Sequence, residues 1–176
     1  GFPWHPHRGI ETITYVLDGT IEHKDSLGNK GILSGGDVQW MTAGSGILHQ
    51  EMPLGNAKGQ MHGFQLWANL PGSQKMVNPR YQDVSGLDIP LLEDDDGSKI
   101  KAVVGSYKGI TGPVDGIAAD PQYFDIYVPP FTKKEISVDA YRNCFAYIFQ
   151  GSANFEYSSK PIGVRVEKEL NGQELN

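Results

Sequence analysis

The chain has 176 residues, 39% of them hydrophobic, which is enough to bury one good core or one complete domain plus part of another. Its formal net charge is −6 and its longest basic run is Lys133-Lys134, so the sequence lacks the positive surface of a protein that binds nucleic acid directly. No apolar stretch approaches the ~20 residues of a membrane-spanning helix. The single cysteine, Cys144, lies in an apolar run and is expected in the core. Together these features predict a soluble protein of a reducing compartment, the cytoplasm, or also the nucleus if the source is eukaryotic.

Short runs rich in Val, Ile, Tyr, Phe and Thr, separated by 22 glycines and 11 prolines, predict an all-β fold. Residues 11–17 and 20–23 flank Asp18-Gly19, a dipeptide that supplies the positive φ angles of a type I′ turn, and they are therefore expected to form a hairpin. Helix is a minor component, expected only as a short segment near residues 79–84. Further strands are expected at residues 31–33, 37–41, 47–52, 62–70 and 100–106.

The composition becomes loop-like between Ser106 and Pro121, which predicts a domain boundary. We expect an N-terminal metal-binding domain over residues 1–110 and a partial second domain, without a metal site, over residues 111–176. Strands are expected again at residues 123–128 and 144–149, but about four candidates beyond the boundary are too few to close a barrel. Because the chain also begins with Gly1 rather than Met, we expect it to be truncated at both ends.

Two pairs of side chains with metal-binding chemistry recur at the same spacing. His5 and His7 are two residues apart, as are His49 and Glu51. In a strand, residues i and i+2 point to the same face with Cα atoms ~6.5 to 7 Å apart, so each pair can reach one ion. If the two strands face each other across a barrel interior, three imidazoles and one carboxylate converge.

The ligand types narrow the choice of ion. Three imidazoles and a carboxylate without a thiolate suit Fe, Mn, Ni or Cu as well as Zn. On a six-coordinate metal, these four ligands leave two positions for a substrate oxygen and for dioxygen or water. Zinc held tetrahedrally by all four would instead form a closed structural site.

The remaining histidines and the large apolar residues of the first half receive simpler interpretations. His23 has charged neighbours and is expected to be solvated. His62 is expected in the core or in a hydrogen bond to a metal-binding side chain, rather than as a metal ligand itself. A metal-bound imidazole usually donates its other N–H to a carboxylate or carbonyl, a role open to Glu11 or Gln65. Four large residues are expected in the barrel core, with a cavity-lining role as the alternative: Trp40, Met41, Phe64 and Trp67.

Several stretches together resemble the pirin family, a branch of the cupin superfamily. FPWHPHRGIETITYVLDG and GDVQWMTAGSGILHQEMP are similar to the two halves of the pirin metal motif, and HGFQLWANLP and KMVNPRYQ continue the likeness. NCFAYIFQGSANF resembles the start of the second, metal-free barrel of this two-barrel family. The resemblance implies a cupin double-stranded β-helix barrel followed by part of a second one.

The resemblance also implies a ligand set and an activity. Its metal ligands would be His5, His7, His49 and Glu51, most often holding iron as Fe(II), with Mn, Ni, Cu or Zn as alternatives. Glu11 occupies the position of a ligand in many other cupins, but the pirin pattern leaves it out unless the strand runs unbroken from His5. A bulge at Gly9 would break that register.

The implied activity is that of a dioxygenase acting on a flavonol such as quercetin, a small aromatic substrate, together with dioxygen. Glu51 would be the catalytic base for the flavonol hydroxyl if its carboxylate swings off the metal. The alternative is a non-enzymatic, iron-dependent transcriptional co-regulator, for which the acidic balance favours a protein partner over DNA.

Overall fold

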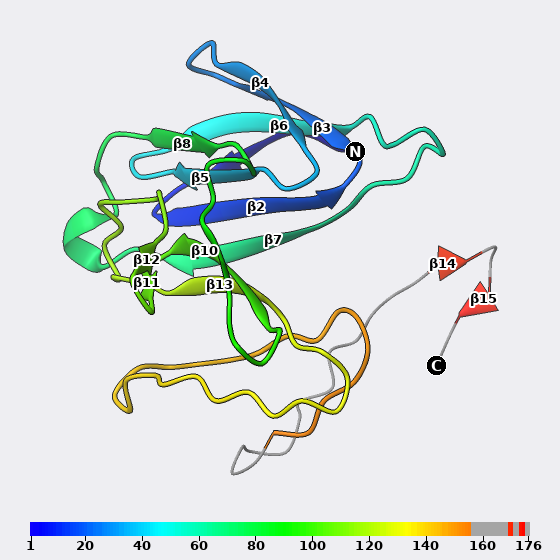
Figure 1. The fold of residues 1–176 in the computed structure, drawn as a ribbon. Helices are drawn as coiled ribbons and strands as arrows, with labels where there is room; N and C mark the ends of the chain where they lie inside the picture. The colour runs from blue at the N-terminus through cyan, green and yellow to red at the C-terminus, as the bar shows by residue number, and fades with distance from the viewer. Residues whose placement is uncertain (156–168, 171–172, 175–176) are drawn as a thin grey trace. The chain divides into compact units, whose positions relative to one another are not determined.

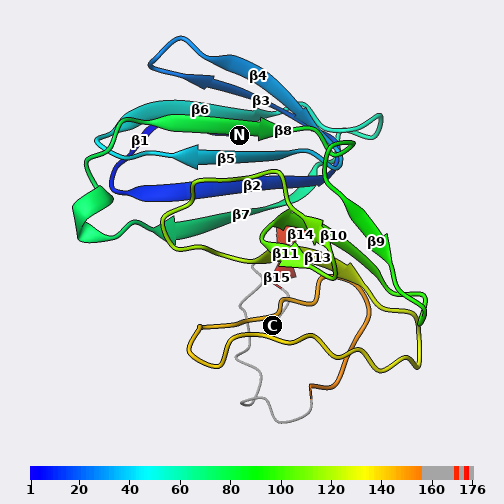
Figure 2. The same ribbon diagram turned by 60° about the vertical axis from the view of Figure 1, so that its left-hand side comes forward.

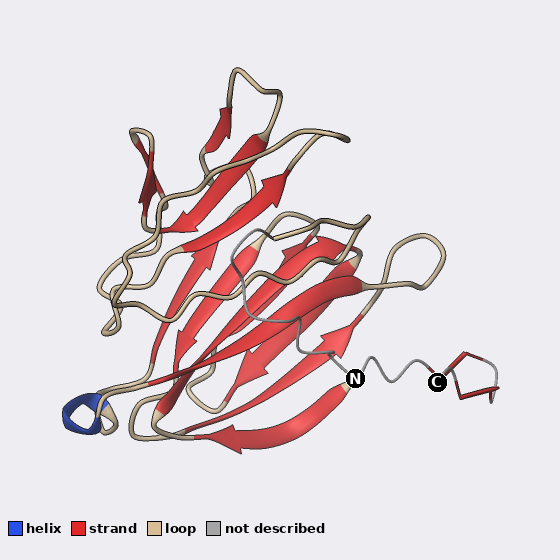
Figure 3. Ribbon diagram, turned by 90° about the horizontal axis from the view of Figure 1, so that it is seen from below, coloured by secondary structure: helices blue, strands red, loops and turns tan. Residues whose placement is uncertain are grey.

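A computed structural model describes residues 1–155, 169–170 and 173–174. Nearly all regular structure in this part of the chain is β-strand, and a single 3₁₀ turn, η1 (Gly72–Gln74), is the one helical element there (Figures 1 and 3). None of the helical structure described is long and apolar enough to cross a membrane. The strands are β1 (Phe2–His7), β2 (Ile10–Asp18), β3 (Thr20–Asp25), β4 (Lys30–Ser34), β5 (Val38–Thr42), β6 (Ile47–Pro53), β7 (His62–Asn69), β8 (Arg80–Val84), β9 (Leu91–Glu93), β10 (Lys99–Val104), β11 (Ser106–Tyr107), β12 (Ile110–Thr111), β13 (Tyr123–Tyr127), β14 (Glu169–Leu170) and β15 (Gln173–Glu174).

Two four-stranded antiparallel sheets form the walls of a barrel. One has the strand order β1-β6-β3-β4 and the other has the order β7-β2-β5-β8. The four strands of the second sheet lie side by side in Figure 2. Side chains meet between the walls: Met41 and Ala43 of the second wall pack with Ile47 of the first, and Ile10 covers them. The all-β cupin barrel expected from the sequence is therefore confirmed.

The alternation of side chains along β2 explains how this strand serves two cores. Thr12, Thr14 and Val16 face the barrel interior, whereas Ile13 and Tyr15 face the opposite side. The outward pair packs with residues of β5, β8 and β10 into the largest apolar cluster, against the three-stranded sheet β13-β10-β9. Because both faces are covered, β2 is buried along most of its length.

The chain passes from the first wall to the second between His7 and Ile10. Gly9 has a φ of +66°, a left-handed conformation that glycine adopts without steric cost, and its N–H donates to Gly44 O at 2.8 Å. The strand that starts at β1 is therefore broken, and β2 belongs to the other sheet.

Three expectations about local structure are wrong. Residues 11–17 and 20–23 were expected to form a hairpin, but β2 pairs with β5 and β7, whereas β3 pairs with β4 and β6 in the other sheet. Residues 79–84 were expected to form a helix, but Arg80–Val84 is strand β8, because pairs such as Met41↔Tyr81 continue the sheet beyond β5. Residues 144–149 form no strand in the described structure, and Cys144 is exposed rather than buried in a core.

The chain divides into two compact units, Gly1–Lys134 and Glu135–Asn176. The first holds both barrel walls and also β13, which pairs with β10 from Lys99↔Tyr127 to Val104↔Tyr123. The second contains the short pair β14 and β15. A second, metal-free barrel over residues 111–176 remains a prediction, and much of that range, residues 156–168, 171–172 and 175–176, lies outside the described residues.

Candidate metal site

The two motif pairs lie on neighbouring strands of one wall. His5 and His7 are on β1, and His49 and Glu51 are on β6. Antiparallel pairing places His5 opposite His49. The pairs therefore do not face each other across the barrel, as the sequence reasoning supposed; they share one sheet and point to the same, inner side.

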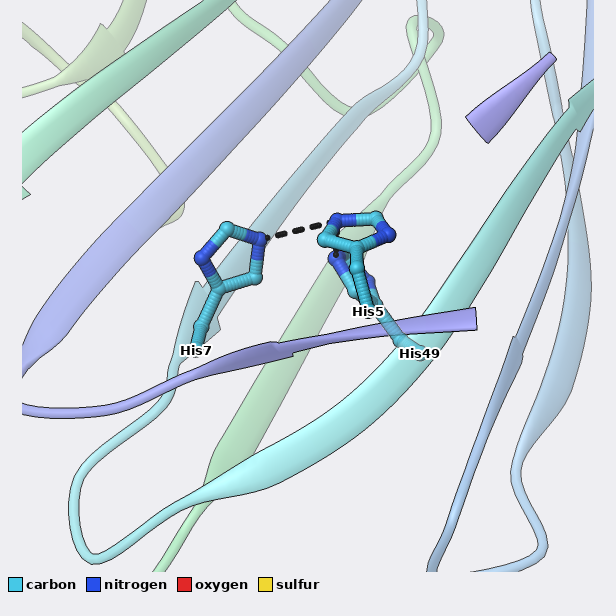
Figure 4. A group of neighbouring side chains, drawn as sticks. All are labelled: His5, His7 and His49. Atoms are coloured by element: carbon cyan, nitrogen blue, oxygen red, sulfur yellow. Dashed lines mark hydrogen bonds between the residues drawn. The ribbon is translucent and has the colours of Figure 1, made fainter. Parts of the chain in front are cut away.

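The imidazole nitrogens of three histidines converge. His5 Nε2 lies 3.1 Å from His7 Nε2 and 2.9 Å from His49 Nε2, and one ligand atom from each ring lies within 4.8 Å of the others (Figure 4). Imidazole nitrogens bind metals at ~2.0–2.1 Å, so two nitrogens at right angles around one ion stand about 3 Å apart. The spacing around His5 fits that arrangement.

The protonation of the rings also suits a cation. His5 Nδ1 donates to Pro3 O at 2.8 Å, so His5 Nε2 is the nitrogen that faces the other two histidines. Burial, followed by the nearby His5, lowers the pKa of His7. Burial, and then the charges of His5 and His7, lower the pKa of His49 to about 3. The lowered pKa values favour the neutral rings of His7 and His49, the form in which histidine binds a metal.

Glu51 lies beside this group, but its carboxylate is held by other residues. It is 2% exposed; Thr14 Oγ1 donates to its Oε1 at 3.0 Å and Gln65 Nε2 donates to its Oε2 at 2.7 Å. Both donors come from the opposite wall, from β2 and β7. The three-histidine cluster does not include Glu51, so its role as fourth ligand remains a prediction.

Glu11 is buried on the other side of β2. It is 2% exposed and accepts a hydrogen bond from Thr42 Oγ1 at 2.7 Å. Counting along β2, Glu11 shares a face with Ile13 and Tyr15 and not with Thr14, which contacts Glu51. The break at Gly9 thus removes Glu11 from the histidine cluster.

His23 is not solvated, contrary to the expectation. It is 2% exposed, its ring centroid lies 5.6 Å from that of His49 and 4.9 Å from that of Tyr81, and burial lowers its pKa. Neither ring nitrogen has a hydrogen-bond partner within the described structure, and Nε2 lies 3.9 Å from Asp25 Oδ2. The signal was available: Ile21, His23 and Asp25 share one face of β3, and all three are buried.

Trp67 and His62 also differ from expectation. Trp67 is 62% exposed rather than part of the core, and its ring lies edge-to-face against His7 with centroids 5.1 Å apart. His62 is exposed, with its ring 5.9 Å from Phe64. Trp40 is buried as expected, as is Met41, and Phe64 is half-buried.

Comparison with known proteins shows that the chain is similar in sequence to pirins. Residues 1–68 match the family model described as Pirin. A pirin-like protein of Caulobacter vibrioides is 42% identical over 160 residues, which are 90% of this chain and 58% of that protein. Pirin-1 of Arabidopsis thaliana is 44% identical over 151 residues, which are 86% of this chain and 51% of the relative.

Solved structures agree with these relatives. GK1651 from Geobacillus kaustophilus superposes with a TM-score of 0.65 at 44% identity, covering 74% of this chain and 51% of that one. A quercetin 2,3-dioxygenase from Acinetobacter baumannii gives a TM-score of 0.57 at 41% identity, covering 64% and 40%. The chain thus spans only 40% to 58% of the length of these four proteins. Its barrel, its histidine cluster and its matched sequence place it in one group: the chain belongs to the pirin family.

Proposed function

We propose that this chain is the metal-binding part of a dioxygenase that acts on flavonols such as quercetin. One observation carries the proposal: three imidazoles converge inside a barrel beside a buried carboxylate. The names of its relatives support the substrate class, since one of the similar structures is a quercetin 2,3-dioxygenase. The alternative, an iron-dependent co-regulator that binds a protein partner, remains a prediction from the resemblance.

In this proposal His5, His7 and His49 hold the metal, with Glu51 as the fourth ligand. The donor set of imidazoles and a carboxylate accepts Fe(II), our choice, and also Mn, Ni, Cu or Zn. When bound, the ion supplies Lewis acidity and orients substrate and dioxygen. Imidazoles add no negative charge and Glu51 offsets only part of the charge of a divalent ion, so an anionic oxygen such as an ionised hydroxyl is favoured next to it.

Glu51 is also the proposed base, a role that requires its carboxylate to leave the metal when the substrate binds. A carboxylate within hydrogen-bond reach of the flavonol hydroxyl accepts its proton. Thr14 and Gln65 donate to the two carboxylate oxygens and thereby restrict the orientation of the group. The barrel walls exclude water from this proton transfer, because the carboxylate is almost completely buried.

The test uses the chain loaded with Fe(II) without oxygen. Mixing with quercetin should shift the flavonol absorption band, and admitting air should bleach it. His49→Ala should abolish both effects, whereas Glu51→Gln should preserve metal binding better than bleaching. Gln50→Ala is the matched control, because Gln50 lies between the two on β6 and faces away. Bleaching that is equal in wild type and His49→Ala would refute the proposal.

A further inference from the structure

A chain of contacts connects the buried carboxylate to the exposed rim of the histidine cluster. Glu51 Oε2 accepts from Gln65 Nε2 at 2.7 Å, and Gln65 Oε1 accepts from Trp67 Nε1 at 3.1 Å. The Trp67 ring then lies edge-to-face against His7. Gln65 and Trp67 are two residues apart on β7, so both side chains point to the inner face of the wall.

The orientation of the Gln65 amide is fixed from both ends, by Trp67 and by Glu51. An indole N–H is only a donor, so it requires the carbonyl oxygen of the Gln65 amide. That requirement turns the NH₂ group of the same amide toward Glu51, where a donor is needed to match a carboxylate. Without the indole N–H, the carboxylate still favours the NH₂ group, but the amide loses the hydrogen bond that anchors its oxygen, so its position beside Glu51 is less restricted.

Trp67 has a second property that the fold does not explain. Most of its surface is exposed, although it lies on the inner face of its strand directly beside a histidine of the cluster. Exposed indoles provide a flat, polarisable surface on which aromatic rings stack. A planar ligand with an oxygen near the three imidazole nitrogens would place its ring system within reach of this indole.

We propose that Trp67 is the substrate-stacking residue of the site and that Gln65 is a positioning residue that links it to Glu51. The inference rests on the proposed function for the identity of the planar ligand, a flavonol. It adds the residue that selects for a flat ring and the reason why Glu51 is correctly oriented. In this proposal the ring of Trp67 stacks on the substrate and its N–H holds Gln65, so substitutions that keep one and remove the other distinguish the two roles.

The first experiment measures binding of Ni(II) alone, without any flavonol. Trp67→Phe keeps a ring but removes the N–H, and Gln65→Leu removes the amide; each should weaken Ni(II) binding roughly 10-fold, as for other residues that orient metal ligands. The double variant should lose no more Ni(II) affinity than either single variant, because Trp67 and Gln65 act through the same hydrogen bond to Glu51. Additive losses, or no loss, would overturn the link. Trp4→Phe, at another exposed tryptophan, is the control.

The second experiment measures quercetin binding to the Ni(II)-saturated protein without oxygen. Trp67→Leu should weaken binding roughly 2- to 12-fold, the range of one aromatic pair, whereas Trp67→Phe should bind almost as well as wild type. Equal binding by all three would overturn the stacking role. Circular dichroism melts check that each variant folds. We expect that they do, because Trp67 is mostly exposed and its substitution removes little buried surface. If wild type fails to consume quercetin in air, the proposed function is refuted, and the Ni(II) measurement still decides the link.

Discussion

The buried histidines should make the metal-free barrel sensitive to mild acid. Burial and neighbouring charges lower the pKa of His49 from 6.5 to about 3. Below about pH 6.5 the unfolded chain therefore binds a proton at this residue that the folded chain does not, so folding stability falls as the pH falls. The loss begins near the unfolded pKa and levels off below the folded one.

The size of the effect follows from linkage. Between about pH 7 and pH 5, His49 alone should lower the free energy of unfolding by about 2 kcal/mol, and the result depends little on the folded pKa while that stays below about 4. His7 and His23, whose pKa values are also lowered by burial, add to it. This pH interval avoids most carboxylate titration, which begins lower.

Urea unfolding of chelator-treated protein at the two pH values measures the effect. In His49→Gln the neutral amide cannot titrate. The difference in the free energy of unfolding between pH 7 and pH 5 should therefore be about 2 kcal/mol smaller than in wild type, whatever the stability of the variant itself. Lys58→Gln, at an exposed residue, is the control and should leave the difference unchanged. If His49→Gln shows the same difference as wild type, His49 is not the buried neutral imidazole described above.

Three further predictions concern single side chains. His49→Ala should lose most of the Fe(II) or Ni(II) bound per chain in equilibrium dialysis, and retention of one ion per chain would contradict the site. Gly44→Ala should lower the melting temperature strongly, because a Cβ would stand 2.0 Å from Val77 O at a φ of +52°; an unchanged melt would be inconsistent with this turn. Tyr15→Phe removes the hydrogen bond from Tyr15 Oη to Asp125 Oδ2 at 2.7 Å and should cost about 1–3 kcal/mol in urea unfolding, with a change near zero speaking against the contact.

The sequence predicted best those features that depend on local geometry. Gly19 adopts the expected positive φ, +85°, between β2 and β3, although these two strands lie in different sheets and do not form the expected hairpin. The i and i+2 spacing of His5 and His7 predicted a shared face, and that face is the inner one. Both follow from rules that operate over a few residues.

What the sequence did not predict depends on partners far along the chain. His23 was interpreted from its charged neighbours, although its alternation with Ile21 placed it inside. The strand Arg80–Val84 looked helical because its pairing partner is more than thirty residues earlier, on β5. Trp67 resembled a core residue by its alternation, but no described side chain covers most of its ring, which is 62% exposed. Such outcomes are set by tertiary contacts that outweigh local preference.

Two of the three converging imidazoles belong to β1, which is the terminal strand of its sheet and has β6 as its one strand partner in the described structure. An ion bridging His5, His7 and His49 would therefore act as a crosslink between an edge strand of this sheet and a strand held on both sides. Detachment of the N-terminal segment and release of the metal become one event, so slower amide hydrogen exchange at Trp4–His7 should accompany every gain in metal affinity.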